Sequence, residues 1–235
     1  MLRKQSWFLI NPLKIKKYTN KKNLRLHLGC SVIRLKNFVN VDVRYTPATD
    51  VTMDLNHVIF QAGSVAVAFS HAFFEHLYRG ERIHHLKGIY HSLNEKTGFI
   101  CYIGLPYFKN IARFYLEKAP GTAGPVFDLF NVYRYTHGDP DRMLKEGWYF
   151  EQLHKSLFDE EELEYLLQNA GFRNFVIFSY AFSQDQNPMA VNIGFYATKV
   201  NKGRIELQND SIQFLKQVFA RSINFDTLEF IGLNA

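Results

Sequence analysis

The amino-acid sequence predicts an α/β fold with a mostly parallel sheet. Short apolar segments rich in β-branched residues alternate along the chain with segments of helical spacing. This alternation is typical of parallel sheets, in which helices connect neighbouring strands. The length of 235 residues suits one such domain with appendages, and 47% apolar with 21% charged residues is ordinary for a protein with a packed core. The composition excludes a disordered chain.

The expected strands begin at residue 24. We expect them at residues 24–28, 38–43, 50–54, 65–70, 99–105, 175–180 and 193–199. The run at 65–70 is apolar and β-branched, which is typical of a strand buried on both faces. Pro106 is expected to end the fifth strand, because proline has no N–H to donate. Only twelve residues separate Gly29 from Asp42, so the first connection has room for little more than one helical turn.

Three helices are expected between and after these strands. Apolar residues at helical spacing predict one over residues 81–93. Asp159, followed by three glutamates, predicts the N-terminus of a second, and Gly171 its end. Asp210 predicts the start of a third, which is expected to run to about Ala220.

The chain divides into an N-terminal arm (residues 1–23), a domain (24–199) with an insertion at 107–150, and a C-terminal extension (200–235). Residues 1–41 contain ten Lys and Arg and no acidic residue, whereas the rest contains 18 basic and 22 acidic residues, so the formal charge of +6 is the sum of +10 and −4. The arm is therefore either a solvated extension or a contact with an anionic surface such as lipid headgroups. The acidic balance of residues 42–235 argues against nucleic acid as a partner.

The sequence predicts neither a disulfide framework nor a metal site. Cys30 and Cys101 have no partner at metal-binding spacing, and two cysteines are typical of a reduced, cytoplasmic chain. His84 and His91 share a helical face but have no third ligand nearby in sequence. No apolar run approaches the length of a membrane span, and the first residues do not have the pattern of a secretory signal.

The clearest chemical signal lies in the first two strands. The first ends in the small-residue turn Gly29-Cys30-Ser31, and the second ends in Asp42. In doubly wound sheets, ligands bind at the carboxyl ends of the strands. A turn that a ligand can approach closely, beside a carboxylate that can accept two hydroxyl hydrogen bonds, predicts a nucleoside site. The alternative is that the glycine serves only an ordinary turn.

Six segments in this order resemble class I S-adenosylmethionine-dependent methyltransferases, and most closely those encoded among polysaccharide and lipopolysaccharide genes. The resemblance covers about residues 24–199. It rests on Leu26-His-Leu-Gly-Cys-Ser31, Phe38-Val-Asn-Val-Asp42, Ser64-Val-Ala-Val-Ala-Phe-Ser-His-Ala-Phe-Phe-Glu-His-Leu77, Asn94-Glu-Lys-Thr-Gly-Phe-Ile-Cys-Tyr-Ile-Gly-Leu-Pro106, Phe158-Asp-Glu-Glu-Glu-Leu-Glu-Tyr-Leu-Leu-Gln-Asn-Ala-Gly-Phe172 and Gly194-Phe-Tyr-Ala-Thr-Lys199.

The resemblance implies a Rossmann-like, seven-stranded, mostly parallel sheet in a three-layer αβα arrangement, with S-adenosyl-L-methionine as the cofactor. The residues it implies at the cofactor are His27, Gly29, Cys30, Ser31, Asp42, Val43, Asp54, Leu55, Ser70 and His71. Asp42 would accept the ribose hydroxyls. Ser31 and Ala66 depart from the Gly and Asp that are frequent in the family, and serine at the first of these positions predicts a turn without a positive φ.

Methyl transfer to a hydroxyl usually needs a group that accepts its proton. His76 is the candidate, with Glu75 to orient it; the alternative is that this pair only braces its loop, and His71 is an equal candidate for the base. The insertion and the segment after it offer aromatic and polar side chains that suit a sugar or another cyclic acceptor: Tyr107, Tyr133, Tyr135, His137, Trp148 and His154.

We therefore expect a methyltransferase that acts on a hydroxyl of a sugar, a glycan precursor or another small molecule. Two alternatives stay open, a nucleic-acid methyltransferase and a binding protein that keeps the fold without catalysis. A homodimer is one option for the oligomeric state. The absence of G-x-G-x-x-G makes a nicotinamide dehydrogenase a poor fit.

Overall fold

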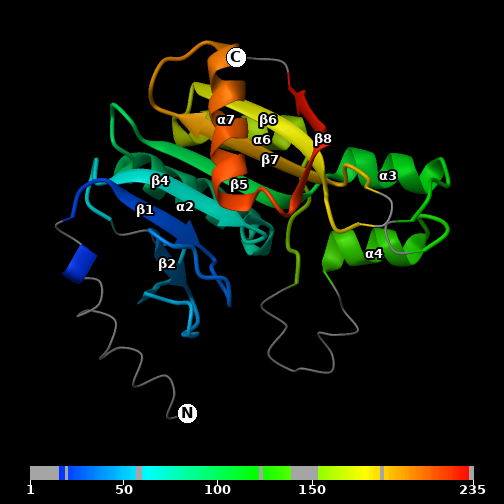
Figure 1. Cartoon of the computed structure of the whole chain (residues 1–235), viewed down its shortest axis with the longest axis horizontal. Helices are drawn as coiled ribbons and strands as arrows, with labels where there is room; N and C mark the ends of the chain where they lie inside the picture. Colours follow the sequence, from blue (N-terminus) through cyan, green and yellow to red (C-terminus); the bar gives the residue numbers. More distant parts are fainter. Residues whose placement is uncertain are drawn as a thin grey trace.

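The computed structural model describes residues 16–18, 21–56, 60–121, 124–138, 153–185 and 188–232. Within these residues, one sheet runs in the order β3-β2-β1-β4-β5-β7-β6-β8 (Figure 1). The strands are β1 (Leu24–Leu28), β2 (Val39–Asp42), β3 (Val51–Thr52), β4 (Val65–His71), β5 (Phe99–Pro106), β6 (Asn174–Phe182), β7 (Asn192–Thr198) and β8 (Ile223–Ile231). The seven strands predicted from the sequence are all present.

The first five strands pair in parallel, and the last three join the sheet in antiparallel pairs. The predicted mostly parallel α/β sheet is confirmed, but among the described residues it has eight strands where seven were expected. Because the parallel strands share one direction, β1, β2, β3 and β4 all end at the same edge, and the loops that follow them gather there. A first helix of little more than one turn was expected, but the described connection between β1 and β2 contains no helix.

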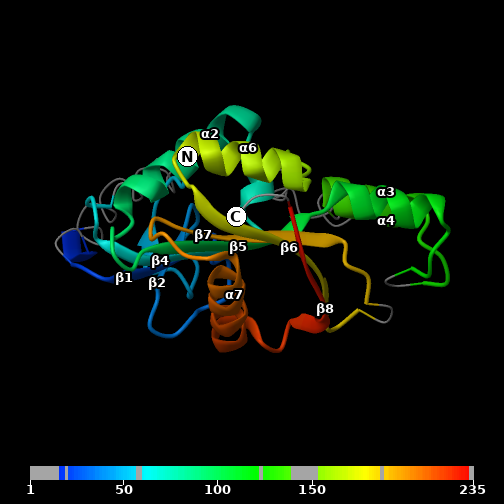
Figure 2. The ribbon, with the colours of Figure 1, turned by 90° about the horizontal axis from the view of Figure 1, so that it is seen from above.

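Helices cover both faces of the sheet (Figure 2). The helices α2 (Arg79–Ser92) and α6 (Glu160–Ala170) lie on one face, and α7 (Arg204–Phe219) lies on the other. Each face has its own apolar cluster, with Leu26, Leu86 and Leu163 on the first and Phe69 and Phe214 on the second. The three-layer arrangement follows from the apolar strands, which must be covered on both sides.

Two further helices, α3 (Phe108–Leu116) and α4 (Leu129–His137), extend past one end of the sheet (Figure 1). Both belong to the expected insertion after β5. They share a small cluster of their own, formed by Ile111 and Phe127 with Met189 and Val191.

The predicted ends of α6 are confirmed. The side chain of Asp159 accepts a hydrogen bond from the backbone N–H of Glu162 at 2.8 Å. Gly171 ends the helix in the left-handed conformation, with φ of 109°. A salt bridge of 3.0 Å between Arg82 and Glu162 joins α2 to α6 over the sheet.

The C-terminal extension differs from its prediction. Helix α7 begins at Arg204, with Gly203 as N-cap, so Asp210 lies inside the helix and the prediction that it caps the N-terminus is wrong. Its carboxylate instead accepts a hydrogen bond from Lys202 Nζ at 2.6 Å. The extension then forms β8, which was not expected from the sequence and which pairs with the edge of β6.

Among the described residues, no helix is long and apolar enough to cross a membrane. Cys30 and Cys101 are both free and buried. Most of the basic arm, and Trp148 of the insertion, lie outside the described residues.

Candidate active site

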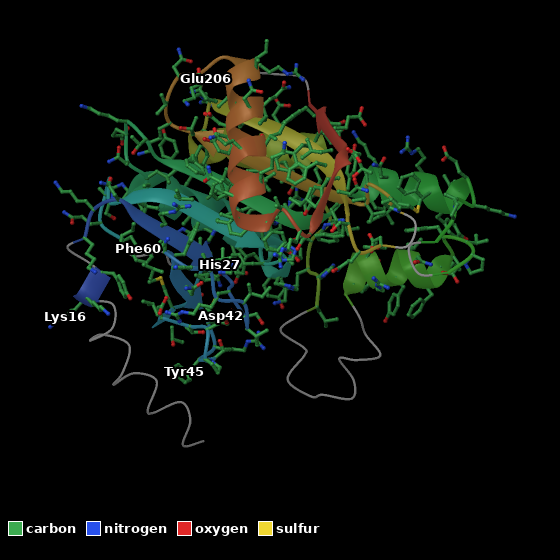
Figure 3. All side chains as sticks on the ribbon, viewed as in Figure 1. Lys16, His27, Asp42, Tyr45, Phe60 and Glu206 are labelled. Atoms are coloured by element: carbon green, nitrogen blue, oxygen red, sulfur yellow. The ribbon has the colours of Figure 1, made fainter. Side chains whose placement is uncertain are left out.

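A cleft of about 310 Å³ opens at the edge where the parallel strands end. Its wall combines the turn after β1, the end of β2, the segment after β3 and the segment after β4. Of the residues expected around the cofactor or its reacting end, it contains Gly29, Ser31, Asp42, Val43, Asp54, Leu55 and His76. Figure 3 labels Asp42 in this region, with Tyr45 further along the same loop.

The turn after β1 is held in a left-handed conformation. Gly29 has φ of 69° and Ser31 has φ of 47°, so the prediction that Ser31 avoids positive φ is wrong. Two hydrogen bonds hold Ser31 in place: its N–H donates to Asp42 Oδ2 at 2.7 Å, and its carbonyl accepts from Thr46 Oγ1 at 2.5 Å. These bonds offset the cost of a non-glycine residue in this region.

The carboxylate of Asp42 is buried at the end of β2. Oδ2 accepts the N–H of Ser31, and Oδ1 accepts the N–H of Arg44 at 2.8 Å. The Arg44 Nε lies 3.7 Å from Oδ1. Each carboxylate oxygen has a second lone pair, so Asp42 can accept two more hydrogen bonds from a ligand in the cleft.

Four of the residues expected at the cofactor do not line this cleft: His71 lines a second one, and the other three are buried. His27 is buried, with its Nδ1 3.1 Å from Asn40 Oδ1, and burial lowers its pKa. The Cys30 thiol is directed toward Thr49 Oγ1 at 3.7 Å, and burial raises its pKa to about 11. Ser70 is buried in β4. Their side chains support the strands and the turn beneath the cleft.

A second cleft of about 450 Å³ lies beside the first, and Ala72 lines both. It is lined by His71, Glu75, Arg134, Tyr135 and His154, together with residues of β5, β7 and the C-terminal extension. Burial lowers the pKa of His71 to about 4.

The other candidates for acceptor binding lie elsewhere. Tyr107 is buried, and its hydroxyl donates to Glu160 Oε2 at 3.2 Å. Tyr133 and His137 are exposed on α4, with ring centroids 4.8 Å apart. Of the described candidates, the structure brings only Tyr135 and His154 to the second cleft.

Between the two clefts lies a group formed by Glu75, His76 and His154. His76 Nε2 is 3.7 Å from Glu75 Oε1, and the rings of His76 and His154 are 5.3 Å apart. Burial raises the pKa of Glu75 to about 8 and lowers the pKa of His76 to about 4. His154 also has a lowered pKa, again because of burial. The three residues are therefore mostly uncharged at neutral pH.

Hydrogen bonds fix the orientation of the two imidazoles. His76 Nδ1 lies 3.2 Å from the carbonyl of Leu153, and His154 Nδ1 lies 2.8 Å from the carbonyl of Tyr135. A carbonyl only accepts, so each Nδ1 carries the hydrogen. In the neutral ring, each Nε2 then keeps its lone pair.

Several residues of the clefts were not predicted from the sequence. In the first they are Arg44, Asn56, Ala72, Phe73, Leu77, Tyr78, Glu81 and Lys155. Phe73 is one that could have been found, because it lies two residues past His71 in a quoted motif. Lys155 could not have been found, because no local pattern connects its segment with η1 (Phe74–His76). The two segments meet in the structure, where the Lys155 N–H donates to the carbonyl of Glu75 at 2.8 Å.

Comparison with known proteins gives structural similarity only. No protein-family model and no curated protein sequence matches the chain. An S-adenosylmethionine-dependent methyltransferase from Thermotoga maritima matches with a TM-score of 0.43 and 14% identity, over 84% of this chain and 95% of that chain. One from Methanosarcina mazei matches with a TM-score of 0.45 and 14% identity, over 80% of this chain and 97% of that chain. One from Archaeoglobus fulgidus matches with a TM-score of 0.45 and 14% identity, over 78% of this chain and 88% of that chain. At these scores the activity of the chain must be judged from its own residues.

Proposed function

We propose that the protein is a methyltransferase that uses S-adenosyl-L-methionine and methylates a hydroxyl of a sugar, a glycan precursor or another small molecule. One observation carries the proposal. The Gly29–Ser31 turn, the Asp42 carboxylate and His76 line one cleft, and this cleft adjoins a second one that has its own aromatic and polar lining.

The first cleft fits a nucleoside cofactor. Its volume is in the range of small-molecule sites. The free lone pairs of Asp42 suit the two hydroxyls of a ribose, and Val43 and Leu55 offer apolar faces for a base. When bound, S-adenosylmethionine supplies a methyl group on a positively charged sulfur.

The chain's own contribution is to position the acceptor and to exclude water. His76 presents its Nε2 lone pair from the wall of the first cleft, where it can accept a hydrogen bond from a hydroxyl. Glu75 Oε1 lies 3.7 Å from the same Nε2, so Glu75 does not orient the ring from its other nitrogen, which faces the carbonyl of Leu153. His71 lines the second cleft. Holding the acceptor oxygen in line with the methyl group is the main source of rate in such a displacement.

We assign the acceptor to the second cleft. Tyr135 offers a ring face and Arg134 a cation, which together suit a polar cyclic molecule such as a sugar. This lining, with the motifs of residues 24–199, supports the proposal that the protein acts in polysaccharide synthesis in the cytoplasm. The basic arm is proposed as a peripheral contact with an anionic surface, and nucleic acid remains the second candidate substrate.

The test is incubation of the full chain with methyl-labelled S-adenosylmethionine and separate pools of nucleotide sugars, oligosaccharides and RNA. The proposal expects label in a sugar pool, and loss of that label in Asp42→Ala. Label only in RNA would overturn the substrate class. Cofactor binding without transfer to any pool would support a binding protein without catalysis.

A further inference from the structure

The group between the two clefts has the composition of a metal site. Glu75 and His76 come from η1, and His154 comes from a segment 78 positions away in sequence. One ligand atom from each residue lies within 4.8 Å of the other two. Two imidazoles and one carboxylate are a ligand set that first-row transition metals use in proteins, with further positions left for water or substrate.

The hydrogen bonds of the two histidines also fit metal binding. Each ring donates from Nδ1 to a backbone carbonyl, that of Leu153 for His76 and that of Tyr135 for His154. Histidines that bind metal through one nitrogen commonly donate from the other to such an acceptor, which fixes the ring. Both Nε2 atoms are thereby left as ligands.

Glu75 gives a second, independent indication. Its side chain is 1% exposed, and among the described residues its Oε2 has no hydrogen-bond partner. A buried polar atom without a partner is costly, and buried charges are usually paired or bound to metal. A cation at this point would satisfy the carboxylate without any change of the backbone.

We propose that Glu75, His76 and His154 bind one divalent transition-metal ion, represented by Zn²⁺. Ligand atoms about 2.1 Å from a tetrahedral ion lie about 3.4 Å apart. His76 Nε2 and Glu75 Oε1 are already 3.7 Å apart. The most distant pair of ligand atoms lies within 4.8 Å, so metal binding requires that pair to close by up to about 1.4 Å.

The position of the ion suggests its use. His76 lines the first cleft, whereas Glu75 and His154 line the second. Open coordination positions would therefore lie where the two clefts meet. This use rests on the proposed methyl transfer: the ion would hold the acceptor oxygen there, and His76 would act as a ligand in place of a hydrogen-bond acceptor for the hydroxyl.

The test is equilibrium dialysis of the chelator-treated full chain against Zn²⁺, Mn²⁺ and Mg²⁺ separately, with Kd and stoichiometry measured for each. One Zn²⁺ per chain is expected, with weaker Mn²⁺ binding and little Mg²⁺ binding, because imidazole is a poor ligand for Mg²⁺. Glu75→Gln and His154→Gln should each weaken Zn²⁺ binding at least tenfold. His84→Gln, on the exposed face of α2, is the matched control and should bind as the wild type does.

Thermal unfolding with and without Zn²⁺ separates a lost site from a lost fold. The wild type and His84→Gln should be stabilised by Zn²⁺, and a folded His154→Gln should not. No stoichiometric Zn²⁺ binding by the wild type, or equal binding by both site variants, would overturn the proposal. Cofactor binding measured on the same samples keeps the two proposals apart: a chain that binds S-adenosylmethionine but no Zn²⁺ refutes only the metal site, and the reverse refutes only the cofactor.

Discussion

The backbone N–H of Ser31 donates to Oδ2 of Asp42 at 2.7 Å, so the turn after β1 and the carboxylate at the end of β2 are joined directly. This bond holds Ser31 at φ of 47°. Two neighbouring parallel strands thus present one rigid wall of the first cleft. The position and the orientation of Asp42 depend on the conformation of a turn eleven residues earlier.

The conformation of Ser31 predicts which residues can replace it. Ser31→Gly should fold and bind cofactor as the wild type does, because glycine adopts positive φ freely. Ser31→Val should cost roughly 1–3 kcal/mol of unfolding free energy, because a β-branched residue is disfavoured at positive φ. Urea unfolding of both variants checks this. Equal stability of the two would show that the turn does not hold Ser31 in the described conformation.

Gly29 is expected to resist substitution for two reasons that can be separated. It has φ of 69°, and an added Cβ would lie 2.6 Å from Phe73 Cβ. Gly63 also has φ of 69°, but nothing lies within 4 Å of its added Cβ. Gly63→Ala should therefore lower the unfolding free energy by only about 1–2 kcal/mol, the cost of a non-glycine residue at positive φ. Gly29→Ala should lower it by about 1–3 kcal/mol more, because the added Cβ overpacks the contact.

The comparison of these two alanine variants by chemical unfolding isolates the contact with Phe73. Phe73→Ala would keep the Cβ, so the matched background is Phe73→Gly, in which Gly29→Ala should cost less unfolding free energy than it does in the wild type. Equal losses for Gly29→Ala and Gly63→Ala would contradict the close approach.

The buried His85 should make the fold sensitive to acid. Its Nδ1 donates to the carbonyl of Leu55 at 2.6 Å, and its Nε2 accepts from the Tyr102 hydroxyl at 2.6 Å. Burial lowers its pKa from 6.5 to about 4. The unfolded chain therefore binds a proton more readily than the folded chain between these values, so the stability that His85 contributes is present above pH 6.5 and is lost as the pH falls toward 4.

Between pH 6.5 and 4, the unfolding free energy of the wild type should fall by up to about 3 kcal/mol more than that of His85→Asn. His85→Asn is expected to be less stable than the wild type at neutral pH, but its stability should depend less on pH. The exposed control His84→Asn should show the same pH dependence as the wild type. Urea unfolding at several pH values measures this. Parallel curves for wild type and His85→Asn would contradict the assignment.

The sequence predicted most of the fold because the strands and helices carry strong local patterns. The predicted caps of α6 match the structure because capping is a local interaction between Asp159 and Glu162. Strand β8 was missed because its pairing with β6 shifts register between Ser179 and Ala181, which interrupts the alternation that marks a strand. The prediction that Asp210 caps α7 was wrong because its carboxylate binds Lys202 rather than a backbone N–H.

The site was predicted where it is local and missed where it is not. Gly29, Ser31 and Asp42 belong to two consecutive strand ends, which parallel topology brings together. The approach of His154 to His76 depends on the path of the insertion, which no short pattern specifies. Conversely, His27 and Ser70 match their motifs in sequence, yet their side chains are buried beneath the cleft.

The most direct test of the central claim is calorimetric titration of S-adenosylmethionine into the wild type, Asp42→Ala and the control Thr46→Val. Thr46 also holds Ser31 in place, because its hydroxyl donates to the carbonyl of Ser31, but Thr46 does not line the cleft. We predict binding to the wild type, a Kd ten- to a hundredfold higher for Asp42→Ala, equivalent to roughly 1–3 kcal/mol, and a smaller change for Thr46→Val. No binding to the wild type, or unchanged affinity in Asp42→Ala, would contradict the account.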